Sequence, residues 1–134
     1  HPSLLRSDLK ENNIVILYGQ DELFDTQGNE LIPKKLILIT EVKDAQRTAD
    51  AMREWESTIS TDLKDIYNLN PVDQATPYFL DNERDTIKIR YKNFPLPDKS
   101  IDYAIVTSLT GRFYLILAGS RESMYFPIDR IRGL

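Results

Sequence analysis

The last third of the chain constrains the fold most, because it reads as three consecutive strands. These are residues 86–93, 101–107 and 112–119. Apolar and basic residues alternate in the first segment, the pattern of a strand with one buried and one solvated face. The third segment is apolar on both faces, so it should lie centrally in the sheet or be covered on both sides. The sequence therefore predicts a mostly antiparallel sheet.

A short closing helix is predicted directly after the third strand. Ser120 is a suitable N-cap, Glu122 lies in the first turn, and Gly133 stands where a helix C-cap belongs. Pro127 interrupts this segment, so the helix either kinks there or begins afresh with Pro127 at its first position.

Two further strands are predicted in the first half of the chain. Residues 14–18 are a continuous apolar run, and residues 35–42 are a second apolar run of strand length. The simplest arrangement pairs these two strands through the intervening loop. Residues 1–12 are interpreted as an entry segment or linker, and residues 13–134 as a single domain.

The main helix is predicted to begin after Asp44, which is a good N-cap. Apolar residues recur at intervals of three and four as far as Ile66, with Trp55 or Glu56 filling one of these positions. We expect a helix of roughly 24 residues, about 36 Å long. The whole pattern predicts an α+β domain in which this long helix and the short C-terminal helix pack on one face of the sheet.

Residues 81–85, with acidic side chains at Asp81, Glu83 and Asp85, are interpreted as a polar hairpin turn. Their spacing superficially resembles the start of a calcium-binding loop. Such a loop needs glycine at its sixth position and glutamate at its twelfth, where this chain has Thr86 and Lys92. We therefore predict no metal site, and no motif indicates a cofactor.

Composition and charge argue against several functions. The chain has no cysteine and its only histidine is His1, so thiolate chemistry and catalysis by an internal imidazole are excluded. The net charge of −4 argues against a nucleic-acid partner. Lys88, Arg90 and Lys92 line one face of their strand, and we interpret them as its solvated face. No catalytic residues are predicted, and no apolar run approaches the ~18 residues that span a bilayer.

Large apolar residues stand at irregular points of the chain, in the proline-containing connection after residue 93 and around the proline of the closing helix. They are Phe94, Leu96, Met124, Tyr125 and Phe126. If the fold leaves them exposed, they form a contact patch for a protein partner or for self-association, because exposed apolar patches of a few hundred Å² are typical of binding surfaces. The alternative is that they close the ends of the core.

A second possible site lies between the long helix and the connection at residues 93–98. Its candidate residues are Arg90, Asp98, Asp102 and Tyr103. These side chains would serve a small-molecule or glycan-binding module, or a hydrolase.

Residues 36–67 and 87–132 resemble uncharacterised extracytoplasmic domains of membrane-anchored bacterial proteins. The resemblance rests on a strand followed by Lys43, Asp44 and a helix, and on a last strand that leads into the Ser-x-Glu-Ser segment at residues 120–123. It implies an upstream anchor helix, a location in the cell envelope and no known enzymatic activity. The expected function is therefore a non-enzymatic interaction or structural domain, with a cytoplasmic location as the alternative.

Overall fold

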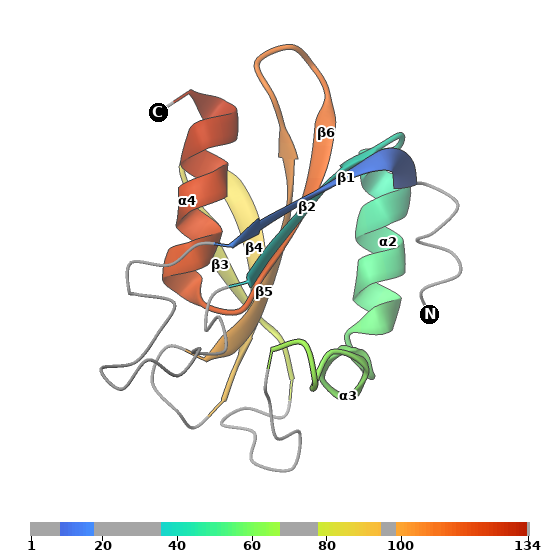
Figure 1. Cartoon of the computed structure of the whole chain (residues 1–134), viewed down its shortest axis with the longest axis vertical. Helices are drawn as coiled ribbons and strands as arrows, with labels where there is room; N and C mark the ends of the chain where they lie inside the picture. The colour runs from blue at the N-terminus through green and yellow to red at the C-terminus, as the bar shows by residue number, and fades with distance from the viewer. Residues whose placement is uncertain (1–8, 18–35, 68–77, 95–98, 134) are drawn as a thin grey trace, which may run out of the picture.

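The computed structural model of the protein describes residues 9–17, 36–67, 78–94 and 99–133. Figure 1 shows the arrangement of its helices and strands. In chain order these elements are β1 (Leu9–Leu17), β2 (Leu36–Val42), α2 (Ala45–Trp55), α3 (Ile59–Asp62), β3 (Leu80–Arg84), β4 (Ile87–Asn93), β5 (Ser100–Thr107), β6 (Phe113–Ala118) and α4 (Arg121–Arg132).

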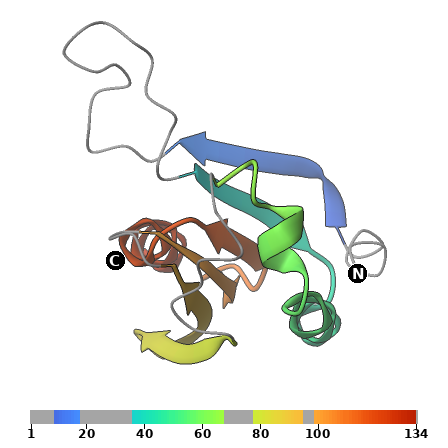
Figure 2. The same cartoon turned by 90° about the horizontal axis from the view of Figure 1, so that it is seen from below.

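The described strands form one sheet in the order β1-β2-β6-β5-β4-β3, and every neighbouring pair is antiparallel. The edges of this sheet are β1 and β3 (Figure 2). Two predictions are confirmed: β1 pairs with β2, and the doubly apolar strand β6 lies inside the sheet between β2 and β5. The sheet and its helices make the protein an α+β domain.

Helices cover both faces of the sheet (Figure 1). Alternate residues of β6 enter different core clusters, since Leu115 and Leu117 pack with the residues of α2, whereas Ile116 and Ala118 pack with those of α4. The expectation that both helices lie on one face is therefore wrong. The physical reason is that the central strands are apolar on both faces, so each face needs its own cover.

The long helix expected after Asp44 is broken into two pieces. Asp44 caps α2 as predicted, with its carboxylate accepting from the Arg47 N–H at 3.0 Å, but α2 ends at Trp55. In the turn that follows, the Trp55 carbonyl accepts from the Thr58 N–H at 3.0 Å, and the Asp62 carboxylate accepts from the Trp55 indole N–H at 2.6 Å. The apolar periodicity continues through the break because α3 packs in the same core cluster as α2.

The closing helix α4 has the predicted caps. The Ser120 hydroxyl accepts from the Ser123 N–H at 3.2 Å, and Gly133 adopts a left-handed conformation with φ of 75°. The helix runs through Pro127, so the alternative of a fresh start there is wrong. Because Pro127 has no N–H, it cannot donate to the Ser123 carbonyl one turn earlier.

The β3–β4 connection is shorter than the sequence predicted. Residues 81–84 belong to strand β3, so the expected polar turn over residues 81–85 is wrong except at its last residue. Only Asp85 and Thr86 form the turn, with φ of 48° and 68°. Two successive left-handed residues are typical of the tight hairpin turn that matches the twist of its strands.

Candidate functional site

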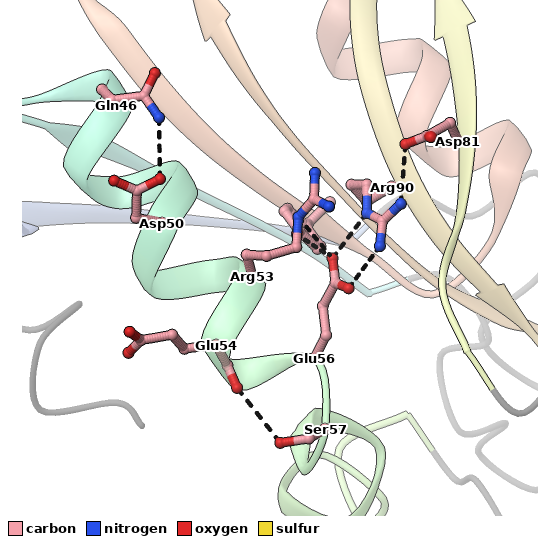
Figure 3. Close-up of polar contacts among 9 residues, drawn as sticks. Gln46, Asp50, Arg53, Glu54, Glu56, Ser57, Asp81 and Arg90 are labelled. Carbon is pink, nitrogen blue, oxygen red and sulfur yellow. Dashed lines mark hydrogen bonds and ion pairs between the residues drawn. The ribbon is translucent and has the colours of Figure 1, made fainter.

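The most extensive polar network among the described residues centres on Glu56, which follows the last residue of α2 (Figure 3). Arg90 of β4 donates from Nε and Nη2 to the two carboxylate oxygens of Glu56, at 2.8 and 2.7 Å. This is the bidentate geometry in which a guanidinium and a carboxylate interact most strongly. The pair therefore ties the end of α2 to the sheet.

Two further groups complete this network. The third donor of Arg90, Nη1, binds Asp81 Oδ1 of the edge strand β3 at 2.9 Å, and the Tyr103 hydroxyl of β5 donates to Glu56. The hydrogen bond to Glu56 raises the pKa of Arg90, and the bond from Arg90 lowers the pKa of the exposed Asp81. Burial raises the pKa of Tyr103, and the hydrogen bond to Glu56 raises it further.

This arrangement has little capacity for acid–base catalysis. Both oxygens of Glu56 accept hydrogen bonds, Arg90 uses Nε and both terminal nitrogens, and the raised pKa keeps the Tyr103 hydroxyl protonated. A general base needs an oxygen or nitrogen that can accept a substrate proton. The geometry is that of a clamp between α2 and the strands β3, β4 and β5.

The residues of the predicted second site are only partly brought together. Arg90 and Tyr103 both bind Glu56. Asp102 lies on the opposite face of the sheet, because alternate residues of β5 share a face and Ala104 packs in the cluster that contains α4. Asp98 lies outside the described residues. The sequence interpretation missed Glu56 as a partner, although its position on the apolar stripe of the predicted helix was a signal that it faces the sheet.

The five residues of the predicted contact patch have different environments. Phe94 and Met124 are buried in the core, on opposite faces of the sheet, so they offer no contact surface in the folded monomer. Tyr125 is half-buried, Phe126 is 38% exposed, and Leu96 lies outside the described residues. Of the five, Tyr125 and Phe126 therefore remain as described residues that can touch a partner.

Arginine and aromatic side chains lie on α4 and on the edge strand β3, which Tyr125 and Asp129 of α4 contact. Arg84 makes a bidentate ion pair with Asp129 at 2.9 and 2.7 Å, and its guanidinium lies 4.3 Å from the centre of the Tyr125 ring. The guanidinium of Arg130 lies 5.9 Å from the centre of the Phe126 ring. We call these five residues the β3–α4 surface.

A buried carboxyl group lies on the α4 face of β5. Asp102 is 0% exposed and accepts a hydrogen bond from the Ser100 hydroxyl, while its Oδ2 has no hydrogen-bond partner in the described part of the chain. Burial raises the pKa of Asp102 to about 6, with a smaller opposing effect from the Ser100 hydrogen bond. The group is enclosed by the protein, so we interpret it as a structural residue that responds to pH.

The basic residues of β4 do not form the solvated face that the sequence predicted. Lys88 is exposed, but Arg90 is engaged with Glu56, and Lys92 is only 6% exposed. The basic side chains point to the same face of the sheet as Phe94, two residues beyond Lys92. Phe94 belongs to the core cluster of α2 and α3, so this face of β4 packs with those helices. The prediction is therefore wrong for Arg90 and Lys92.

Among the described residues, no group of three or more acidic or histidine side chains is arranged to hold a metal ion. No helix in the described ranges is long and apolar enough to cross a membrane. Comparison of the chain with protein-family models, with curated proteins and with solved structures gives no match.

Proposed function

We propose that this chain is a non-enzymatic interaction domain and that it forms the soluble part of a membrane-anchored envelope protein. The observation that carries the first half of this proposal is the closed network around Glu56. In this network the side chains of Arg90, Tyr103 and Glu56 bind each other rather than facing solvent with unused donors or acceptors. A domain built in this way acts through its surface.

The β3–α4 surface is the contact region that we propose. It combines arginine, tyrosine and phenylalanine, the residue types enriched at the energetic centres of protein interfaces. Its ion pair between Arg84 and Asp129 fixes the arginine side chain in place before binding, which reduces the entropy lost on association. The neighbouring edge strand β3 adds backbone groups to which a partner can hydrogen-bond.

Site-specific photo-crosslinking in the full-length protein tests this surface. A photoreactive amino acid replaces Phe126 in one variant and Ser57, which is exposed on the α2–α3 turn, in a control variant. We expect a discrete crosslinked species from position 126 and none from position 57. Equal crosslinking from both positions, or none from position 126, would show that this surface is not the contact region.

The envelope location is supported by the resemblance described for residues 36–67 and 87–132, and the absence of cysteine is compatible with it. Fractionation of native cells, combined with protease treatment of intact cells, tests it independently of the interaction. We expect the full-length protein in the membrane fraction, with this domain cleaved from outside the cytoplasmic membrane. Recovery in the soluble cytoplasmic fraction would exclude this location.

The alternative is a small-molecule or glycan-binding module, or a hydrolase, with its site between α2 and the residue 93–98 connection. One observation favours ligand binding on this side of the sheet: Lys92 is buried there without an anionic partner among the described residues. No corresponding observation favours hydrolysis.

A further inference from the structure

The exposed residues of α4 follow a regular spacing. From its second residue onward, the helix exposes only Glu122, Phe126 and Arg130. These residues stand four apart, so they form one stripe along the outer side of the helix. The inner side of α4 packs on the sheet, where Met124 and Ile128 are fully buried. We call Glu122, Phe126 and Arg130 the outer stripe of α4.

The outer stripe has an acidic end, an apolar centre and a basic end. Glu122 lies in the first turn of α4 and Arg130 in the last turn, where the helix dipole favours these signs of charge. The dipole does not explain Phe126 between them, which is 38% exposed. Glu122 and Arg130 are about 12 Å apart along the helix axis, whereas ion pairs within one helix join residues three or four apart. A second helix that runs in the opposite direction matches all three positions.

This charge pattern is complementary to itself. When two copies of the outer stripe lie antiparallel about a two-fold axis at Phe126, each Glu122 faces Arg130 of the partner subunit and the two Phe126 rings meet. A two-fold interface uses the same patch on both subunits, so each contact between different residues occurs twice. Three residues thus supply two contacts between opposite charges and one aromatic contact.

We propose that this chain forms a symmetric dimer through the outer stripe of α4. The dimer rests on the proposed interaction function, because Phe126 and Arg130 belong to the β3–α4 surface, and it specifies the partner as a second copy of the chain. The Arg130 guanidinium lies 5.9 Å from the centre of the Phe126 ring. It therefore stays beside the aromatic contact while it faces the opposing carboxylate.

The outer stripe is held in place before binding. Beside it on α4, the Tyr125 hydroxyl accepts from the Asn82 amide at 3.0 Å, and Asp129 accepts both hydrogen bonds of Arg84. Both contacts fix α4 to the edge strand β3. A surface fixed in this way loses less conformational entropy on association.

The length of α4 limits the strength of the dimer. The helix has 12 residues and is about 18 Å long. Two helices of this length bury less than the ~1,200–2,000 Å² of stable interfaces, so we expect a dissociation constant on the order of 0.1 mM. If both copies are anchored in one membrane, as in the proposed function, their effective concentration rises and so weak a contact suffices.

Sedimentation velocity of the intact chain, from tenfold below to tenfold above this dissociation constant, tests the proposal. We expect a reversible change from monomer to dimer that weakens as the salt concentration rises. Glu122→Lys and Arg130→Glu should each weaken dimerisation at least tenfold, because each creates two pairs of like charges in the interface. Glu54→Lys makes the same change of charge at an exposed position of α2 and should dimerise as the parent chain does. A parent chain that stays monomeric over the whole range overturns the proposal.

Mixing the two charge-reversal variants tests the contact between Glu122 and Arg130 directly. In a heterodimer of Glu122→Lys with Arg130→Glu, both contacts again join opposite charges, so the mixture should dimerise more strongly than either variant alone. The double variant with both substitutions should dimerise by itself for the same reason. A mixture that stays monomeric, or single variants that dimerise as the parent chain does, would contradict the antiparallel pairing.

Photo-crosslinking from position 126 separates failure of the dimer from failure of the contact region. A product with twice the mass of the full-length protein supports a second copy as the partner. A product of another mass, together with a monomeric parent chain, overturns the dimer but supports the β3–α4 surface as a contact region for a different protein. No product from position 126 overturns the contact region itself.

Discussion

The carboxylate of Glu56 accepts two parallel hydrogen bonds from the guanidinium of Arg90, at 2.7 and 2.8 Å, across the boundary between the end of α2 and the sheet. The two side chains are only 12% and 17% exposed, so solvent screens their interaction weakly. Removal of one partner leaves the other charge poorly solvated.

We expect Glu56→Ala to lower the free energy of unfolding by roughly 2 kcal/mol, because the partly buried Arg90 loses its bidentate partner and keeps only its hydrogen bond to the exposed Asp81. Arg90→Met and the double variant complete a double-mutant cycle, measured by urea denaturation. The double variant should lose less free energy of unfolding than the two single variants lose together.

As a control, Asp129→Ala breaks the more exposed pair with Arg84 and should lower the free energy of unfolding by less than Glu56→Ala does. Additive effects of Glu56→Ala and Arg90→Met would show that the pair is not coupled.

The turn between α2 and α3 provides a second test. Asp62→Ala removes the acceptor of the Trp55 indole N–H, a bond of 2.6 Å, and leaves a part-buried donor unsatisfied. We expect a loss of about 1 kcal/mol in the free energy of unfolding and a change in the fluorescence of Trp55, the only tryptophan. Asp65→Ala, an exposed change on the same segment, is the control. An unchanged emission spectrum in Asp62→Ala would argue against this hydrogen bond in solution.

Asp102 predicts a specific pH dependence of stability. Burial raises its pKa from 3.8 in a solvated carboxyl group to about 6, so the folded state holds a proton that the unfolded state releases. The contribution of protonated Asp102 to the free energy of unfolding is therefore complete below pH 3.8. It is lost as the pH rises through about 6 and the buried carboxyl group ionises. A pKa difference of this size corresponds to roughly 3 kcal/mol.

Asp102→Asn isolates this contribution, because asparagine has a similar shape and does not ionise. We expect the variant to gain stability relative to the parent chain as the pH rises from 4 to 7, with urea denaturation at each pH as the measurement. Contributions of the other carboxyl groups are common to both proteins and cancel in the difference. A difference in stability that stays constant across this range would show that Asp102 titrates like a solvated carboxyl group.

The strand and cap positions could be predicted from the sequence because they follow from local chemistry. The alternation of apolar and basic residues over residues 87–92 identifies a strand, and Asp44 and Ser120 identify helix starts, without knowledge of any distant residue. The double apolar character of β6 similarly predicted its central place in the sheet.

The network around Glu56 could not be predicted in the same way. Its partners Arg90 and Tyr103 lie 34 and 47 residues further along the chain, on two different strands. The contacts of Arg90 and Tyr103 with Glu56 depend on the order of strands in the sheet and on which face α2 covers. A local sequence pattern predicts neither of these. The burial of Lys92 has the same origin, since alternation shows which residues share a face but not which face receives a helix.

The helix break was also beyond local reasoning. Ile59 and Leu63 continue the apolar spacing of α2, so the periodicity alone predicted one uninterrupted helix. At the break the Trp55 indole N–H donates to Asp62, a hydrogen bond that spans seven residues rather than the three or four of a helical turn.

Thr86 predicts a stabilising substitution. Its φ of 68° places a β-branched residue in the left-handed region, where Cβ clashes with the neighbouring backbone, and Asp85 before it has φ of 48°. We expect Thr86→Gly to raise the free energy of unfolding by about 1 kcal/mol, the relief of this strain less the extra chain entropy of glycine. Asp85→Gly is the matched control and should gain less, since aspartate tolerates this conformation. Thermal unfolding of the three proteins measures both effects, and a Thr86→Gly variant less stable than the parent chain would contradict the left-handed conformation at Thr86.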